Sequence, residues 1–236
     1  SLKIMIKRTV ILFLAIIGYA LSISSTAQPS SGVRLTKNWQ FLKGDLGGVW
    51  EAVRPAKQGD PQSVPAWENI VLPHCFNAED AVDPDLNYYQ GPGWYRTNLK
   101  ISNPYPDGRI LLHFEGAGQK TEAFIFTRSA GKHTGGYDEF TFDITDAVNE
   151  FTKNELYKTQ FKETIPVSIR CDNSRDLEMI PSDLSDFNLY GGIYRYLNLV
   201  YVPSLYIESL FTDPVTDPSG KTGSLKISAS IAAKGA

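Results

Sequence analysis

Side chains that could act as nucleophiles or metal ligands are scarce in this chain. Two cysteines and three histidines among 236 residues leave little material for a Cys/His metal site. No helix start follows the glycine pairs Gly135-Gly136 and Gly191-Gly192, whereas a phosphate loop uses the N-terminus of a helix. We interpret both pairs as backbone positions that need a positive φ or a close approach. The remaining candidates for chemistry are carboxylates, amides and aromatic rings.

The composition indicates a folded globular protein. Hydrophobic residues make up 42% of the chain, aromatic residues 12% and charged residues 21%, which excludes a disordered or collagen-like chain. The formal net charge is -3 and there is no run of Lys or Arg. Because affinity for nucleic acids depends largely on such positive charge, no nucleic-acid partner is expected.

The elements that position the candidate groups are strands. Past residue 32 apolar residues mostly alternate, as in half-buried strands, with turn-forming residues between the runs. In the run 122–126 this alternation places Phe124 and Phe126 on the apolar face. One helix signal stands out, a short turn after Asp143 that Thr145 or Asp146 is expected to cap. Many short strands predict an all-β antiparallel sandwich of the jelly-roll or immunoglobulin kind.

The first 27 residues resemble a secretory signal peptide. A basic pair, Lys7-Arg8, precedes an apolar run of about 13 residues and a Ser-x-Ala site that ends at Ala27. The alternative, a membrane helix, needs roughly 20 apolar residues. No cysteine stands at the cleavage site to carry a lipid, so no stable membrane anchor is expected. We therefore expect a periplasmic or secreted protein.

The two cysteines allow two interpretations. In an oxidising compartment Cys75 and Cys171 could form a disulfide. Cys171, however, alternates with Val167 and Ile169 on the apolar face of an expected strand, where a free thiol behaves as a small hydrophobic group. The second interpretation is favoured.

A domain boundary is expected near Pro203. New strands begin at Leu205 and Leu225, and two or three strands cannot bury a sandwich core of their own. We predict a signal peptide over 1–27, a complete sandwich over 28–203, and the start of a second, truncated sandwich over 204–236.

The order of several short motifs resembles the N-terminal part of glycoside hydrolase family 2, the family of β-galactosidases, β-glucuronidases and β-mannosidases. Each motif alone is weak, but eight occur in family order. They are 35–41 (LTKNWQF), 72–74 (LPH), 93–96 (GWYR), 114–116 (FEG), 131–137 (GKHTGGY), 140–145 (FTFDIT), 172–174 (DNS) and 190–195 (YGGIYR). The resemblance implies a jelly-roll sugar-binding domain, similar to galactose-binding domains, followed by an immunoglobulin-like domain.

The family's chemistry is retaining hydrolysis of a β-glycosidic bond, which uses two carboxyl groups about 5 Å apart. In the family both belong to glutamates of a barrel that follows the immunoglobulin-like domain. The resemblance therefore assigns no catalytic residue to this chain and implies that the chain alone is inactive. The expected partners are a carbohydrate and the C-terminal barrel, with homo-oligomerisation left open. The alternative is a stand-alone carbohydrate-binding or structural module.

The resemblance also points to sugar contacts, which would come from polar planar groups and aromatic rings. Asp186 stands six residues before Gly192, the spacing of a β-galactosidase aspartate that contacts galactose hydroxyls and a nearby cation. On that match alone a β-galactosidase is favoured and a monovalent or divalent cation near Asp186 is implied; otherwise Asp186 caps a turn. Asn87 is the nearest amide in the second sugar-contact loop, or a turn former. Tyr88 and its neighbour Tyr89 could stack on a sugar or pack under the loop.

Other conspicuous residues are expected to be structural. His74 and His133 match family positions that serve loop packing. Trp39, Trp67 and Trp94 are expected to fill the sandwich core. Arg195 is expected to pair with an acidic residue of the same domain.

Overall fold

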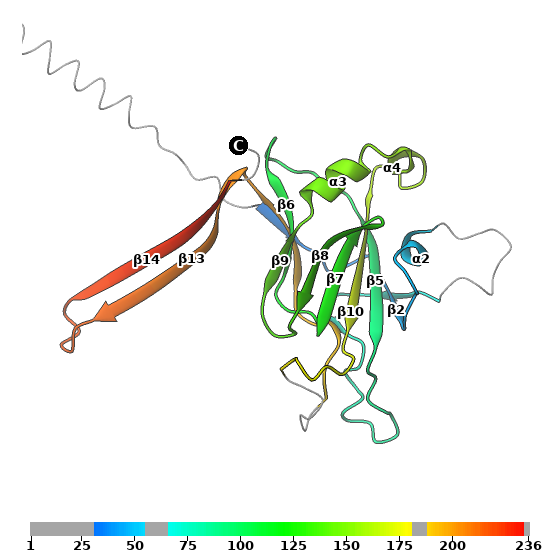
Figure 1. The fold of residues 1–236 in the computed structure, drawn as a ribbon, viewed down its shortest axis with the longest axis horizontal. Helices are drawn as coiled ribbons and strands as arrows, with labels where there is room; N and C mark the ends of the chain where they lie inside the picture. The colour runs from blue at the N-terminus through cyan, green and yellow to red at the C-terminus, as the bar shows by residue number, and fades with distance from the viewer. Residues whose placement is uncertain (1–30, 55–65, 181–187, 234–236) are drawn as a thin grey trace, which may run out of the picture.

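The alternating strands form two antiparallel sheets that pack face to face (Figure 1). The structure is a computed structural model and describes residues 31–54, 66–180 and 188–233. The larger sheet has the strand order β3 (Glu68–Ile70), β2 (Trp39–Lys43), β5 (Pro92–Leu99), β10 (Ile165–Asp172), β7 (Lys120–Ile125), β8 (Arg128–Thr134). The smaller has the order β1 (Ser31–Arg34), β12 (Leu197–Val202), β6 (Arg109–Phe114), β9 (Phe140–Asp143). This is the sandwich that the alternation predicted.

Short elements complete the sandwich. Strands β4 (His74–Cys75) and β11 (Gly192–Ile193) pair with each other. Three short helices, α2 (Trp50–Val53), α3 (Thr145–Phe151) and α4 (Glu155–Thr159), lie in connections between strands. Within the described ranges, no helix has the length and apolar character that crossing a membrane requires.

The core lies between the two sheets. Tyr95, Ile169 and Leu112 are fully buried members of one hydrophobic cluster that draws on both sheets. Cys171 is also completely buried in this cluster and is a free thiol, as is the half-buried Cys75. The structure therefore agrees with the interpretation of Cys171 as a small core residue.

The face assignment of β7 was wrong. The buried residues of this strand are Thr121, Ala123 and Ile125, because the register with β10 places them beside its inward-facing residues. Phe124 lies on the outer face of the sheet, where its ring stacks on Trp94 with centroids 5.8 Å apart.

The expectation that all three tryptophans fill the core holds only for Trp39. Trp94 is buried, but it lies on the outer face, opposite its core neighbour Tyr95, and its Nε1 donates to Asp45 Oδ1 at 3.4 Å. Trp67 is half-buried beneath the guanidinium of Arg96. Strand alternation explains the error, because adjacent residues such as 94 and 95 cannot both face the core.

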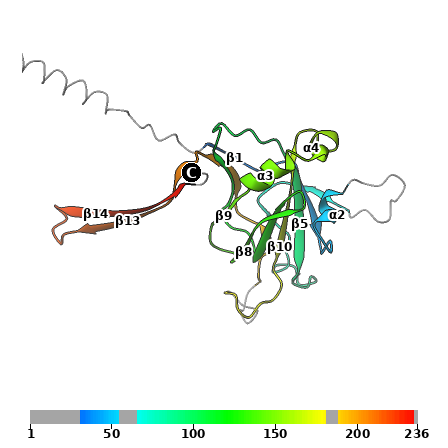
Figure 2. The ribbon, with the colours of Figure 1, turned by 45° about the horizontal axis from the view of Figure 1, so that its top comes forward.

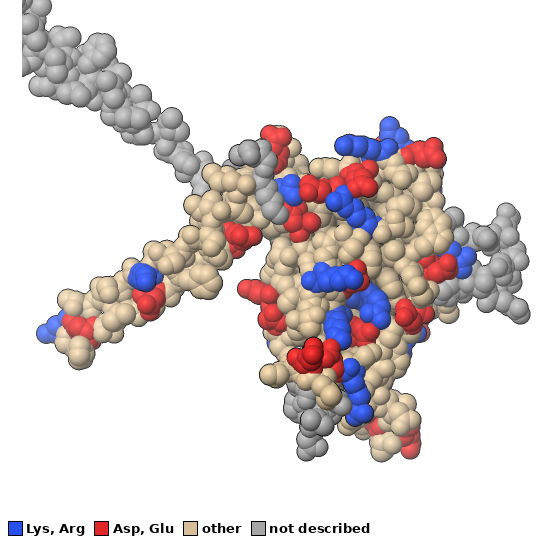
Figure 3. All heavy atoms as spheres, viewed as in Figure 1, with Lys and Arg blue, Asp and Glu red and all other residues tan. Residues whose placement is uncertain are grey.

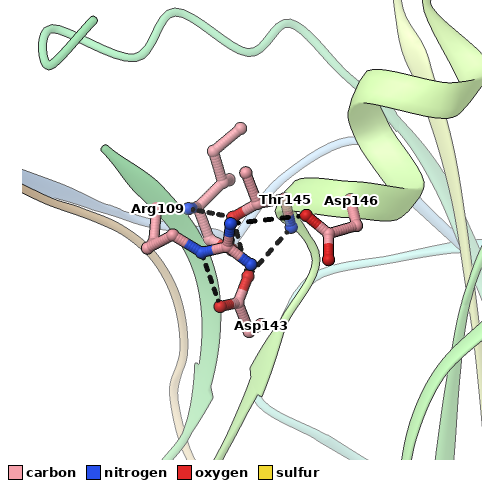
Figure 4. A network of polar contacts seen from close by, with 5 residues as sticks. Arg109, Asp143, Thr145 and Asp146 are labelled. Carbon is pink, nitrogen blue, oxygen red and sulfur yellow. Dashed lines mark hydrogen bonds and ion pairs between the residues drawn. The ribbon is translucent and has the colours of Figure 1, made fainter. Parts of the chain in front are cut away.

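The start of α3 differs from the expected cap. Neither Thr145 nor Asp146 caps the helix; Asp143 Oδ1 instead accepts from the backbone N–H of Thr145 at 3.1 Å. The Thr145 hydroxyl oxygen accepts from the N–H of Ile110 at 2.8 Å and so ties the helix to β6. Arg109 Nε donates to Asp143 Oδ2 at 2.8 Å, and its Nη1 donates to Asp146 at 3.3 Å (Figure 4). The network joins β6, β9 and α3.

The last two strands form a separate hairpin. Strands β13 (Leu205–Thr216) and β14 (Gly223–Ala233) pair only with each other among the described residues, and both views show them projecting away from the sandwich (Figures 1 and 2). Apolar side chains on both strands, such as Ile207, Phe211 and Ile231, are exposed. The start of a second domain at residue 204 stays a prediction that this hairpin does not test.

Charged side chains of both signs intermingle on the face shown in Figure 3. Over the larger sheet, Lys132 pairs with Glu122 at 3.2 Å, and Arg170 pairs with Asp172 at 2.8 Å.

Candidate functional site

Two long loops leave the same end of the sandwich. Strands β5 and β10 are antiparallel neighbours whose register pairs Pro92 with Asp172. The segment 76–91, which leads into β5, and the described residues 173–180 and 188–191, which follow β10, therefore meet at one end of the sheet, at the bottom of Figure 1. We call this the loop end. The expected sugar contacts Asn87 and Tyr88 belong to it.

Asn173 joins the two loops. Its side chain is fully buried, and its Oδ1 accepts from the N–H of Gly91 at 2.9 Å. Its Nδ2 donates to the carbonyl oxygens of Tyr89 and Leu189, both at 2.8 Å. One amide thus satisfies three backbone groups from loop segments that lie about a hundred residues apart in the sequence. Because a buried backbone group without a partner is costly, this contact fixes the separation of the loops.

A second pair of amides reinforces the junction. Asn77 Nδ2 donates to Leu189 O at 2.9 Å and to Asn188 Oδ1 at 3.2 Å. Asn188 Nδ2 donates back to Asn77 O at 3.2 Å, and the N–H of Gly191 donates to Asn77 Oδ1 at 2.8 Å. Both asparagines are buried.

Gly191 and Gly192 show the two features expected of this pair, a close approach of another group and a positive φ. A Cβ at Gly191 would lie 2.2 Å from Phe76 Cζ, and Gly192 has φ +120°. The other pair behaves alike, with φ +136° at Gly135 and a Cβ at Gly136 that would lie 2.6 Å from the Tyr194 hydroxyl. These glycines allow close packing, as the sequence predicted.

Tyr89 packs beneath the loop. Its hydroxyl donates to Pro92 O at 2.8 Å. Its ring packs edge-on against the ring of Phe76, with ring centroids 5.6 Å apart, and Lys43 Nζ lies 4.6 Å from the centroid of the Tyr89 ring. Its backbone N–H donates to the buried Asp80 carboxylate at 2.6 Å. Burial raises the pKa of the Tyr89 hydroxyl. Of the two roles open to this tyrosine, the structure supports packing.

The predicted ligands Asn87 and Tyr88 lie on the surface of the same loop. Asn87 is exposed, and 52% of Tyr88 is accessible. Both side chains are therefore free to meet a ligand, although their role as sugar contacts stays a prediction. Asp186 lies outside the described residues, so the structure tests neither this residue nor the cation expected beside it. The described ranges contain no cluster of three potential metal ligands.

The histidines expected to be structural do make packing contacts. His74 Nδ1 and the hydroxyl of the core residue Tyr95 share a hydrogen bond of 2.9 Å, and burial lowers the pKa of His74. His133 stacks on Phe140 with centroids 3.9 Å apart.

The contacts of Arg195 differ from the expected pairing with an acidic residue. Its Nη1 donates to the backbone carbonyls of Tyr137 at 2.9 Å and Glu115 at 3.3 Å, so the acceptors found within the described ranges are main-chain oxygens and not a carboxylate. The side chain ties down the turn before β9 and the end of β6.

Sequence reasoning missed the three buried asparagines. Asn173 stood in the turn cluster 172–174 and Asn188 in the segment before the glycine pair, but nothing in their spacing marked them as buried partners. The available signal was their position in or beside three of the motifs: Asn173 lies within 172–174, Asn77 follows 72–74, and Asn188 precedes 190–195 with its close-packed glycines.

Comparison with known proteins places this arrangement in a larger context. No family model matches the chain. A β-glucuronidase from Bacteroides fragilis is 31% identical over 198 residues, which are 84% of this chain and 24% of that protein. A β-galactosidase from Thermoanaerobacter pseudethanolicus is 26% identical over 176 residues, 74% of this chain and 21% of that protein.

Among solved structures, β-glucuronidase from Parabacteroides merdae superposes with a TM-score of 0.83 and 57% identity, over 87% of this chain and 26% of that one. This chain spans about a quarter of the length of the curated relatives it matches. It is homologous to the N-terminal region of family 2 glycoside hydrolases, and its sandwich matches their sugar-binding region; the catalytic portion is not covered.

Proposed function

We propose that this chain is the sugar-binding N-terminal part of a family 2 β-glucuronidase. The observation that carries the proposal is the contrast in similarity among solved structures: 57% identity to a β-glucuronidase, against 25% to a putative β-galactosidase from Bacteroides fragilis. The earlier preference for a β-galactosidase rested on the spacing of Asp186 alone, and it gives way to this contrast.

In this proposal the chain supplies one wall of the sugar site. Retaining hydrolysis needs an acid and a nucleophile, two carboxyl groups about 5 Å apart, and these belong to the barrel of the full-length protein. The loop end contributes recognition through Asn87, Tyr88 and Asp186. The buried Asn173 and Asn77 support this role, because they hold the two ligand-bearing loops together before any sugar arrives.

Exposed apolar side chains support the view that the loop end is covered in the full-length protein. Among the described residues of its two loops, six such side chains are exposed: Val82, Leu86, Tyr88, Leu177, Ile180 and Tyr190. Exposed apolar surface that gathers at one end of a molecule commonly marks an interaction site. We propose that the barrel packs here and that the sugar is held between the two parts.

Export is a further part of the proposal. The basic start, short apolar run and Ser-x-Ala site of residues 1–27 support secretion into the periplasm or the medium. N-terminal sequencing of the mature protein from culture fractions tests it, with Gln28 as the expected first residue.

The experiment for the activity compares 4-nitrophenyl β-D-glucuronide with the matching β-D-galactoside as substrates of the full-length protein. The proposal predicts hydrolysis of the glucuronide with the higher kcat/KM and no turnover by residues 28–236 alone. Preference for the galactoside would overturn it, and binding without turnover by the full-length protein would favour the stand-alone module. Replacing Asp186 with Ala should lower kcat/KM, and an unchanged value would remove it from the sugar site.

A further inference from the structure

A cavity of about 450 Å³ opens on the outer face of the larger sheet. Strands β2, β5 and β10 form its floor, and α2 together with Phe161, which follows α4, forms its walls. It lies beside Arg96 and Ser168, which pair in register four residues away from the loop end. Its size falls within the range of sites for small molecules. None of the described residues that line it is acidic.

Arg96 gives the cavity a positive charge that no carboxylate of the described residues pairs with. Its Nε donates to Gln40 Oε1 at 2.9 Å, its Nη1 donates to Ala52 O at 3.0 Å, and Trp67 covers one face of the guanidinium at 4.1 Å. A guanidinium has five N–H donors, so three remain available beyond the hydrogen bonds found in the described ranges. None of the ion pairs between described residues involves Arg96. Burial lowers the pKa of this arginine, and a bound anion would offset that cost.

Ser168 supplies an independent observation. The residue is 0% exposed, it lines the cavity, and its Oγ has no hydrogen-bond partner among the described residues. Buried polar groups are nearly always paired, so an unpaired hydroxyl on a residue that lines a cavity indicates a missing partner. A hydroxyl group of a ligand can both donate to and accept from it.

The remaining lining narrows the chemistry of that ligand. Amides of Asn38 and Asn98 can bind hydroxyl groups, while Val53 and Phe161 offer an apolar wall for C–H groups. We propose that this cavity is a second, non-catalytic binding site for a sugar acid, a monosaccharide-sized carboxylate that carries several hydroxyl groups. The carboxylate meets Arg96 and one hydroxyl meets Ser168. This inference goes beyond the proposed function and rests on the cavity alone.

To test this, the 236-residue chain is titrated separately with sodium D-glucuronate, D-glucose and sodium acetate. Binding is measured by calorimetry, and the residues affected are identified from NMR chemical shifts. Glucuronate should bind at least tenfold more tightly than glucose, which lacks the carboxylate, and more tightly than acetate, which lacks the hydroxyls. Equal binding of acetate, or no binding of glucuronate, would overturn the proposal. Chemical-shift changes confined to the loop end would also overturn it.

Two variants locate the site. Asn98→Asp places a negative charge at an exposed position of the cavity and should weaken glucuronate binding at least tenfold, and Ser168→Ala should weaken it about fivefold. The matched control is Asn149→Asp, the same change at an exposed residue that lines a different cavity beside Arg109. If the control weakens binding as much as Asn98→Asp, the cavity is not the site. Hydrolysis by the full-length protein is measured separately, so failure of one proposal does not imply failure of the other.

Discussion

The clearest consequence of the loop junction concerns Asn173→Ala. The substitution removes three hydrogen bonds and leaves the buried N–H of Gly91 and the half-buried carbonyl of Tyr89 without the partner they had. The carbonyl of Leu189 keeps its bond from Asn77 at 2.9 Å. With about 1–3 kcal/mol for the buried N–H and about 1 kcal/mol for the half-buried carbonyl, the loss of unfolding free energy should be about 2–4 kcal/mol. For a domain of this size that lowers Tm by roughly 5–15 °C.

The assay is thermal and urea unfolding of the chain, with Asn87→Ala as the control. Asn87 lies on the same loop but is exposed, so its loss should change stability by less than about 0.5 kcal/mol. Asn173→Asp keeps the acceptor for Gly91 but directs a carboxylate at two carbonyl oxygens, so it should destabilise at least as much as Ala. Equal stabilities of Asn173→Ala and Asn87→Ala, or an Asp variant as stable as the wild type, would refute the role of this amide.

Three further predictions follow from other buried groups. Burial raises the pKa of Cys171 from 9.0 to about 12, so wild-type unfolding free energy should fall as the pH rises from 9 toward 12, because only the unfolded thiol ionises; Cys171→Ala should show a shallower fall in urea titrations. Burial raises the pKa of Asp143, but hydrogen bonds from Arg109 and Thr145 outweigh this effect and hold the pKa below 3.8. Asp143→Asn should therefore lower the unfolding free energy by about 1–3 kcal/mol at pH 7. Its difference from the wild type should shrink as the pH falls below 3.8. Gly191→Ala should cost about 1–3 kcal/mol by overpacking against Phe76, whereas Gly48→Ala, which meets nothing within 4 Å, should leave Tm unchanged.

The strand pattern predicted the sandwich because one face of each sheet is buried, which forces alternation. The pattern failed where the second face is also covered. Trp94 and Phe124 stack on the outer face of the larger sheet, so an apolar residue on β5 or β7 no longer reveals which side is the core. Only the register with β10 decides it.

Motif order predicted which loops carry Asn87, Tyr88 and Asp186, and the role of these residues as sugar contacts stays a prediction. The sequence did not predict the buried amide contacts of Asn77 and Asn173, because these include backbone groups more than eighty residues away, and no local pattern encodes such pairs. The contact of Asp143 with the first turn of α3 was not predicted for a related reason, since the N–H of Ile110 on β6 engages the hydroxyl of Thr145.

The most direct test of the proposed function is a crystal structure of the full-length protein with glucuronate bound in the catalytic pocket. We expect the loop end to close one side of that pocket, with side chains of the segments 83–91 or 181–188 within hydrogen-bond distance of the sugar. A loop end that faces solvent, with every sugar contact made by the barrel, would contradict it.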